Sequence, residues 1–332
     1  MALGDDLTVA QMTKVELHLH LDCSLSYEVV SLLDPTISRR RFDAEFIAPP
    51  QCASLADFLT RAPRGIQLMQ SEEELRFVTQ DLFEQLRRDK VIYAEIRFAP
   101  LLHIEKGLTP PAVVAAVDRA TGDCIKETGI EARLILCTLR HFSPEQSLYT
   151  AQLVERFKGS HVVALDIAGD EAGFPVDAHI PAYRFAIDHG ISRTAHAGEA
   201  RGADSVWETL RAFQPSRIGH GVRSIEDPSL VEHLRQERIH LEICPSSNVQ
   251  TRACHTYGDH AVDRLFRSGV SLGINTDART ITNVTLEQEY DRLRTHFSWR
   301  DEELLACNRE ALRAAFLEEP VRARMLTQLE TI

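Results

Sequence analysis

Two histidines near the start of the chain are spaced so that they could bind one metal ion. His18 and His20 lie in the stretch Lys14-Val-Glu-Leu-His-Leu-His-Leu-Asp22, where apolar and polar residues alternate as in a β-strand. Residues i and i+2 of a strand point to the same face, so both imidazoles would face one point. A single His-x-His pair also fits structural or surface histidines. The choice between these interpretations depends on whether the rest of the chain supplies further ligands.

Two more residues of a metal-binding type lie on later predicted strands. His196 lies in the strand predicted at 192–199, and Asp277 ends the strand predicted at 270–277. Three imidazoles and one carboxylate form a nitrogen and oxygen set that suits zinc, and iron or another divalent ion is compatible with it. A bound zinc ion lowers the pKa of water to about 7, which favours hydrolytic chemistry. We therefore predict one Zn²⁺, or another divalent metal, held by His18, His20, His196 and Asp277.

A glutamate and a fourth histidine are candidates for proton transfer beside that metal. Glu199 lies three residues after His196, in a turn that contains glycine, and could donate a proton if its surroundings raise its pKa. His220 lies between Gly219 and Gly221 and could orient or deprotonate an attacking water. The alternatives are an ordinary loop carboxylate for Glu199 and a hydrogen-bonded core histidine for His220.

The order of predicted strands and helices would bring these residues together. Eight β-then-α units predict an α/β fold, a closed (β/α)8 TIM barrel, with residues 1–332 forming a single domain. Active sites of such barrels lie at the carboxyl ends of the strands, which is where the candidate residues fall. The strands are predicted at 14–22, 91–100, 132–140, 162–169, 192–199, 217–221, 239–248 and 270–277.

Amphipathic helices are predicted between the strands, and the first connection is the longest. Residues 27–88, interrupted at Ala48-Pro-Pro50, form a helical insertion between the first two strands that is long enough to cover the site. The other helices are predicted at 110–128, 144–157, 181–189, 205–213, 228–237 and 261–268. Further polar residues at predicted strand ends are Asp166, Ser247, Asn248, Arg97 and Arg140, and the two arginines are expected to have structural roles.

Composition and charge exclude several classes of protein. The net charge of −12, without a long run of lysine or arginine, argues against binding to nucleic acid. No apolar run approaches the roughly 18 residues that span a bilayer, so no membrane contact is expected. The opening Met-Ala-Leu-Gly-Asp-Asp lacks the features of a signal peptide, which favours a cytoplasmic protein. The seven cysteines include no Cys-x-x-Cys pair, which indicates reduced thiols. Nothing in the sequence defines an oligomeric state.

The candidate residues also carry a family resemblance. Six motifs within residues 14–277 resemble those of the adenosine deaminase family of metal-dependent aminohydrolases, and they occur in that family's order. The resemblance implies a (β/α)8 barrel with a single zinc ion and hydrolytic deamination at C6 of a 6-aminopurine. The motifs are Lys14-Val-Glu-Leu-His-Leu-His-Leu-Asp22, Asp166-Ile-Ala-Gly-Asp-Glu171, His196-Ala-Gly-Glu199, Gly219-His-Gly221, Cys244-Pro-Ser-Ser247 and Asn275-Thr-Asp277.

The resemblance implies a role for each candidate. Glu199 matches the proton donor to purine N1, and His220 matches the residue that orients and activates the attacking water, which Asp277 also holds. Binuclear relatives carry a modified lysine at the end of the fourth strand, and its absence here predicts one metal. The residues that match the metal ligands are His18, His20, His196 and Asp277. The residues expected at the substrate are His20, Asp22 at a ribose hydroxyl, Gly169 through its backbone, and Ala278.

Two departures from the family pattern bear on the substrate. Ala278 stands where the family usually has an aspartate that donates a hydrogen bond to purine N7, and losing one neutral hydrogen bond costs about 0.5–1.5 kcal/mol. Cys23 stands where glycine is more usual, and either repacks locally or changes the specificity near the sugar. Candidates to replace the N7 contact are Arg279, Thr280 and Asn283.

The expected reaction is deamination of adenosine or 2′-deoxyadenosine to inosine or 2′-deoxyinosine and ammonia. The carboxylate of Asp22 would repel a phosphate and accept a hydrogen bond from a hydroxyl, which favours a nucleoside over a nucleotide. A modified adenine nucleoside or another aminated heterocycle is the alternative substrate. A catalytically silent nucleoside-binding or interaction protein is a third interpretation, disfavoured because such a protein has no physical need for four ligands, an acid and a base.

Overall fold

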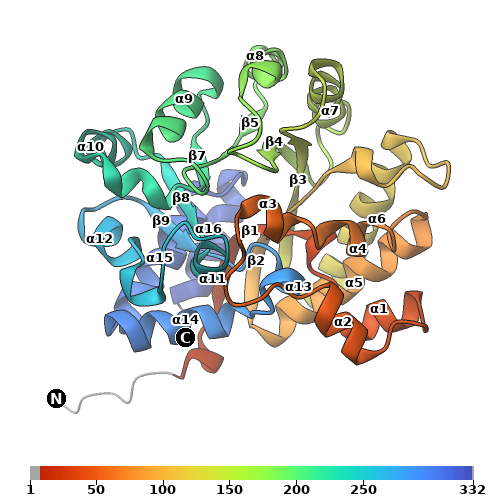
Figure 1. The fold of residues 1–332 in the computed structure, drawn as a ribbon, viewed down its shortest axis with the longest axis horizontal. Helices are drawn as coiled ribbons and strands as arrows, with labels where there is room; N and C mark the ends of the chain where they lie inside the picture. Colours follow the sequence, from red (N-terminus) through yellow and green to blue (C-terminus); the bar gives the residue numbers. More distant parts are fainter. Residues whose placement is uncertain (1–7, 331–332) are drawn as a thin grey trace.

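Parallel strands form the centre of the molecule, and helices surround them (Figure 1). The computed structural model describes residues 8–330, so the opening Met-Ala-Leu-Gly-Asp-Asp, from which the absence of a signal peptide was predicted, lies outside the described residues. Neighbouring strands pair in parallel. The strands are β1 (Lys14–His20), β2 (Val91–Phe98), β3 (Glu131–Leu139), β4 (Val162–Ala168), β5 (Ser192–Arg193), β6 (His196–Ala197), β7 (Arg217–His220), β8 (His240–Ile243) and β9 (Leu272–Ile274).

The strands form one sheet in the order β1-β2-β3-β4-β5 and a second in the order β6-β7-β8-β9. A short segment of chain joins them, because the predicted fifth strand is present as two pieces, β5 and β6. Between these pieces, the Thr194 N–H donates to the carbonyl of Leu165 (3.0 Å), and the carbonyl of Ala195 accepts from the Gly219 N–H (2.9 Å). The segment therefore pairs first with the end of one sheet and then with the start of the other.

The opposite edges meet where β1 lies beside the segment after β9. Leu19 and Asp277 form a parallel bridge. The His20 N–H donates to the Asp277 carbonyl (2.8 Å), and the Asp277 N–H donates to the His18 carbonyl (3.1 Å). The predicted (β/α)8 barrel is confirmed, and its last contact places Asp277 directly beside the two histidines of β1.

The helices that follow the later strands agree closely with the predicted ranges because their ends carry clear sequence signals. In the helix at 110–128, the Thr109 hydroxyl accepts from the Ala112 N–H, Pro110 occupies the first turn, and Gly129 ends the helix at φ +73°. These helices are α6 (Pro110–Thr128), α7 (Pro144–Arg156), α8 (Ile180–Asp188), α9 (Ala203–Phe213), α10 (Pro228–Gln236) and α12 (Val262–Arg267). Among the described residues, none of the helices is long and apolar enough to cross a membrane.

The insertion between β1 and β2 contains five helices, and its break at residues 48–50 is confirmed. The longest, α5, begins after Ser71, whose side chain accepts from the Glu74 N–H, and buries one apolar face against the barrel. The short α3 begins after Ser54, which caps it in the same way. The helices are α1 (Tyr27–Leu33), α2 (Arg39–Glu45), α3 (Leu55–Leu59), α4 (Ala62–Ile66) and α5 (Glu72–Arg88).

Several predicted strands are too long, and the one predicted at 270–277 is present only as β9 (Leu272–Ile274). The strand predicted at 239–248 ends at Ile243, and the chain then turns into α11 (Pro245–Gln250), since a proline at the first helical position favours a helix start. The helices after β9, which the sequence analysis did not predict, are α13 (Arg279–Thr282), α14 (Leu286–Phe297), α15 (Asp301–Ala314) and α16 (Glu319–Glu330).

Charged side chains occupy the interior of the barrel. Arg97 donates to Asp166 (2.8 Å) and Glu242 (2.7 Å), and Arg217 contacts the other oxygen of Glu242 (2.8 Å). All four side chains are fully buried, which is tolerated only because each charge is paired. Arg140 donates to the carbonyl of His196 (2.9 Å). These contacts agree with the structural roles expected of Arg97 and Arg140.

Glu289 on α14 makes the stability of the fold depend on pH. It is fully buried, and its Oε1 accepts from the Ser246 N–H (3.0 Å). Burial raises its pKa from 4.5 to about 7, partly offset by Arg292. Between pH 4.5 and about pH 7, Glu289 therefore keeps its proton in the folded state and loses it in the unfolded state. Its stabilising contribution is fully present below pH 4.5 and is lost as the pH rises to about 7.

Glu289→Gln should remove this dependence. Relative to the native chain, the variant should gain up to about 3 kcal/mol in unfolding free energy between pH 5 and pH 8, which is the shift in pKa converted to energy. Denaturant unfolding at the two pH values measures the difference. The exposed Glu302 provides a control, since Glu302→Gln should show no such gain. Equal behaviour of the two variants would contradict the assignment.

Candidate active site

Metal-binding side chains converge at the carboxyl ends of β1, β6 and β9. Nε2 of His18 lies 3.2 Å from Oδ1 of Asp277, and Nε2 of His20 lies 3.4 Å from the same oxygen. Nε2 of His20 lies 3.2 Å from Nε2 of His196. The barrel thus brings together the four residues predicted as ligands. Potential ligand atoms of His18, His196, His220 and Asp277 also all lie within 4.8 Å of one another, so a fifth donor is near.

Two carboxylates fix the protonation of His18 and His196. Nδ1 of His18 lies 2.8 Å from Glu242, and Nδ1 of His196 lies 3.1 Å from Asp166. A carboxylate can only accept, so each Nδ1 carries a proton and a neutral ring leaves Nε2 bare. Nε2 of His18 is buried and has no hydrogen-bond partner. This is the arrangement that a metal ion requires of its histidine ligands.

The charge states of His20 and His196 also suit a metal ion. Burial lowers the pKa of His20 to about 3, and burial lowers the pKa of His196 as well. Burial and Arg97 act to lower the pKa of His18, but its contacts with Asp277 and Glu242 raise it overall. Neutral His20 and His196 beside an ionised Asp277 fit a divalent cation. The raised pKa of His18 favours its protonated form, so His18 would release one proton when it binds a metal ion. Sequence reasoning missed Glu242, although its place on β8, facing the interior, could have indicated it.

Asp277 and His220 adopt backbone conformations that are unusual for residues with side chains. Their φ angles are +66° and +61°, in the left-handed region. The Ser247 hydroxyl donates to Oδ2 of Asp277 (2.7 Å) and leaves Oδ1 facing the histidines. Such conformations persist where the surrounding contacts hold them, and they aim both side chains into the site.

Glu199 lies in a turn held by a second glutamate. The Glu171 carboxylate accepts from four consecutive backbone N–H groups, those of residues 198–201, and from the Ser205 hydroxyl (2.6 Å). Burial raises the pKa of Glu199 well above its usual value, and the negative charges of Asp277 and Glu171 raise it further. The raised pKa favours the protonated form of Glu199, in which it can act as an acid. Sequence reasoning gave Glu171 no role, because its partners are backbone groups.

His220 lies beside Glu199, with its Nε2 3.5 Å from a Glu199 oxygen. Its neighbouring glycines are required by close packing. A Cβ on Gly219 would lie 2.9 Å from the His18 ring, and one on Gly221, at φ +64°, would lie 2.6 Å from Leu241. Burial lowers the pKa of His220 well below its usual value, so the ring is neutral.

A small cavity lies beside these side chains. Its volume is about 50 Å³, enough for a few water molecules but far below the several hundred Å³ of typical ligand pockets. Leu55, Phe58 and Leu59 of α3 line this cavity together with residues of the site, His196 and Glu199 among them. Figure 1 shows α3 lying across the centre of the barrel. A nucleoside needs more space than this cavity provides, and the residues of α3 in its lining agree with a covering role for the insertion.

Comparison with known proteins places this site in a family. Residues 13–332 match the family described as adenosine deaminase. The chain belongs to the adenosine deaminase family. It is 34% identical to an adenosine deaminase of Clostridium acetobutylicum, over 97% of this chain and 98% of that one. It is also 34% identical to an adenosine deaminase of Mycobacterium ulcerans, over 97% and 95%. This protein is therefore a hydrolytic deaminase.

Solved structures of other deaminases share the fold. An adenine deaminase from Arthrobacter aurescens is 23% identical, covers 96% of this chain and 98% of its own, and superposes with a TM-score of 0.88. An amidohydrolase from Burkholderia ambifaria with bound Zn is 21% identical, covers 98% and 93%, and gives a TM-score of 0.89. At this level of identity the likeness supports the barrel fold of this deaminase. Its substrate has to be inferred from the residues of its own site.

The residues predicted at the substrate do not all reach the cavity of the deaminase. His20, Gly169 and Ala278 line it, together with Cys23. Asp22 lies behind Cys23, lining a small adjacent space, where one oxygen accepts from the Ala99 N–H (3.2 Å). Its other oxygen lies 4.0 Å from Nδ1 of His20.

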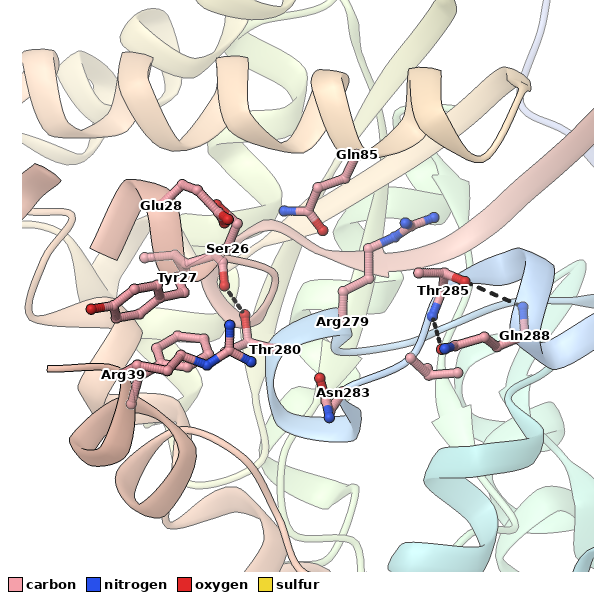
Figure 2. A pocket seen from close by; sticks show the side chains of 13 residues that line it. Ser26, Tyr27, Glu28, Arg39, Gln85, Arg279, Thr280, Asn283, Thr285 and Gln288 are labelled. Carbon is pink, nitrogen blue, oxygen red and sulfur yellow. Dashed lines mark hydrogen bonds between the residues drawn. The ribbon is translucent and has the colours of Figure 1, made fainter. Parts of the chain in front are cut away.

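The candidates to replace the missing contact beside Ala278 point elsewhere. Arg279 pairs with Glu16 (2.7 Å) and with Asp89 (2.6 Å), and the Thr280 hydroxyl donates to the carbonyl of Leu25 (2.6 Å). Figure 2 shows Arg279, Thr280 and Asn283 lining a different pocket, between α1, α5 and α14. Buried carboxylates hold Arg279 and a carbonyl holds Thr280, and none of the three candidates lines the cavity beside Ala278. Ala278 instead packs with Phe58, Leu55 and Ile281.

Proposed function

We propose that this protein is a zinc-dependent deaminase of a 6-aminopurine nucleoside, most simply adenosine or 2′-deoxyadenosine. The observation that carries the proposal is the buried Glu199, whose pKa is raised, next to a cluster of three histidines and Asp277. An acid and a metal-binding cluster that line one cavity suit hydrolysis of a C–N bond. The overall reaction adds one water to the nucleoside and releases inosine, or its deoxy form, and ammonia.

Separate residues would bind the metal, transfer the proton and hold the substrate. His18, His20, His196 and Asp277 would hold the metal, which when bound lowers the pKa of water. Glu199 would transfer a proton to N1 of the purine as water adds to C6. His220 would help to place that water. Gly169, at φ +100°, would present its backbone to the purine, and Asp22 would accept a hydrogen bond from a ribose hydroxyl.

The charge near the sugar favours a nucleoside over a nucleotide. Contacts with His103 and His20 outweigh the effect of burial and lower the pKa of Asp22, so it carries a negative charge at neutral pH. A phosphate near that buried carboxylate would be repelled. One structural neighbour of 22% identity is an Arabidopsis N6-mAMP deaminase, so a nucleotide is the natural competing substrate to include in a test.

Ammonia release from a panel of compounds tests the function. The zinc-loaded protein and a chelated control would be given adenosine, 2′-deoxyadenosine, N6-methyladenosine, adenine, AMP and non-purine aminated rings. We expect adenosine or 2′-deoxyadenosine to be the fastest substrate and the chelated control to be inactive. Activity on another compound alone would support the alternative substrate, which Ala278 and Cys23 allow. Inactivity on the whole panel with zinc bound would contradict the proposal.

Ala278→Asn should improve turnover of adenosine. An amide at this position could donate to purine N7, and a neutral hydrogen bond of about 0.5–1.5 kcal/mol corresponds to a roughly 2- to 10-fold rise in kcat/KM. The measurement is steady-state kinetics with adenosine and with 7-deazaadenosine, which lacks the N7 acceptor. The rise should occur with adenosine only.

A size control separates the hydrogen bond from packing. Ala278→Val adds bulk without a donor and should lower kcat/KM for both compounds, because Ala278 packs against Phe58 and Ile281. If Ala278→Asn improved both compounds equally, the gain would come from packing and the expected N7 contact would be wrong.

A further inference from the structure

Nδ1 of His220 faces an amide, whereas a carboxylate is the neighbour of Nδ1 in the other three histidines of the site. Nδ1 of His18 and Nδ1 of His196 face carboxylates, and Nδ1 of His20 has Asp22 as its nearest charged neighbour (4.0 Å). Nδ1 of His220 instead faces the side-chain amide of Asn248 (3.0 Å). The protonation of His220 therefore depends on which way that amide is oriented.

A backbone group decides the orientation of the amide. The Val262 N–H lies 3.0 Å from Nδ1 of His260, and a backbone N–H can only donate. Nδ1 of His260 is therefore an acceptor. His260 is buried, and burial lowers its pKa to about 3, so the ring is neutral and carries its one proton on Nε2.

The proton on Nε2 of His260 fixes the orientation of the Asn248 amide, and that amide fixes the protonation of His220. Nε2 of His260, now a donor, lies 3.1 Å from the side chain of Asn248, so the atom facing it must be the amide oxygen. The NH₂ group of Asn248 then faces Nδ1 of His220, at 3.0 Å, and donates to it. Because Nδ1 of His220 accepts this hydrogen bond, the ring carries its one proton on Nε2, the atom that points toward Glu199.

We propose that the chain of hydrogen bonds from Val262 through His260 and Asn248 holds His220 in its Nε2–H form, so that His220 donates a hydrogen bond to the attacking water. A protonated Nε2 can neither bind the metal nor take a proton from water. The metal ligands are then His18, His20, His196 and Asp277, although His220 is equally close to the cluster. Asn248 and His260 are positioning residues. The part about the water rests on the proposed function.

Nitrogen NMR of histidine-labelled protein tests the tautomer directly. Long-range ¹H–¹⁵N spectra distinguish protonated from bare ring nitrogens, and a His220→Asn sample identifies the His220 signals. We expect a bare Nδ1 and a protonated Nε2 in both metal-free and zinc-loaded protein. A proton on Nδ1, or an Nε2 that loses its proton on zinc loading, would overturn the proposal.

Two variants connect the tautomer with catalysis. Asn248→Leu keeps the size of the side chain but removes the donor, so His220 should populate both tautomers and kcat should fall by about 10²-fold, with KM little changed. His260→Gln keeps an amide N–H donor to Asn248 and should retain the Nε2–H form and most of kcat. Zinc content and thermal unfolding confirm that both variants fold. A single unchanged tautomer in Asn248→Leu, or unchanged kcat despite mixed tautomers, would contradict the proposal.

The two proposals fail separately. The NMR measurement needs no substrate, so a protein that released no ammonia from any compound would contradict the proposed function and leave the tautomer of His220 established. An active enzyme with a proton on Nδ1 of His220 would do the reverse.

Discussion

Glu199→Gln should abolish ammonia release while leaving the metal bound. The side chain lies at the edge of the metal-binding cluster, where its nearest histidine is His220 at 3.5 Å, and its Oε1 has no hydrogen-bond partner. Glutamine fills the same space and can donate a hydrogen bond, but it cannot give up a proton. Loss of a general acid lowers kcat by about 10²–10⁴-fold. The loss is larger where departure of the leaving group also depends on that acid.

The measurement combines steady-state ammonia release with metal analysis of the same sample. Zinc content of Glu199→Gln should equal that of the native chain, because Glu199 is not one of the proposed ligands. Glu237, an exposed glutamate at the end of α10, provides a matched control, and Glu237→Gln should keep full activity. Near-native activity of Glu199→Gln would rule out Glu199 as the acid, and loss of zinc would show that it acts on the metal site instead.

The four predicted ligands could be found from the sequence because strand geometry is local. Alternation along 14–20 fixes the shared face of His18 and His20, and the β/α order places His196 and Asp277 at the same end of the barrel. The helix at 110–128 was predicted with its observed ends because its threonine cap, prolines and final glycine act within a few residues.

The parts that sequence reasoning missed depend on long-range partners. Arg279 follows Asp277 and Ala278 closely, yet it turns toward Glu16 and Asp89, which lie far away in sequence. Nothing local to Arg279 indicates those partners. The same is true of Asn248, whose side chain takes its orientation from His260 and so from a backbone group of the next helix.

Glu242 is the clearest example of a residue whose role depends on long-range partners. Its carboxylate pairs with arginines of the barrel interior and also faces His18 of the site. Its Oε2 accepts from Arg97 (2.7 Å) and faces Nδ1 of His18 (2.8 Å), while its Oε1 faces Arg217 (2.8 Å) and accepts from the Thr194 hydroxyl (3.0 Å). Burial acts to raise the pKa of Glu242, but Arg97 and Arg217 lower it well below its usual value. The carboxylate is therefore ionised and balances two buried cations.

Glu242→Gln should weaken both the fold and the metal site. Glutamine keeps the shape but removes the negative charge, and its NH₂ group must face a donor on one side. Leaving a buried charge without its partner costs about 3–5 kcal/mol, measurable by denaturant unfolding of the metal-free protein. If the NH₂ faces His18, Nδ1 of His18 becomes an acceptor and its proton moves to Nε2, which no longer binds metal. Zinc affinity should then fall by about 10- to 100-fold in a competition titration.

Glu95 allows the two effects to be separated. It pairs with the same Arg217 inside the barrel and accepts from the Tyr93 hydroxyl (2.8 Å), but it makes no contact with His18. Glu95→Gln should therefore lower the unfolding free energy and leave zinc affinity unchanged. If both variants weakened zinc binding equally, the loss would come from a general loosening of the barrel. A loss confined to Glu242→Gln would show that this carboxylate sets the tautomer of His18, as His260 and Asn248 do in the opposite sense for His220.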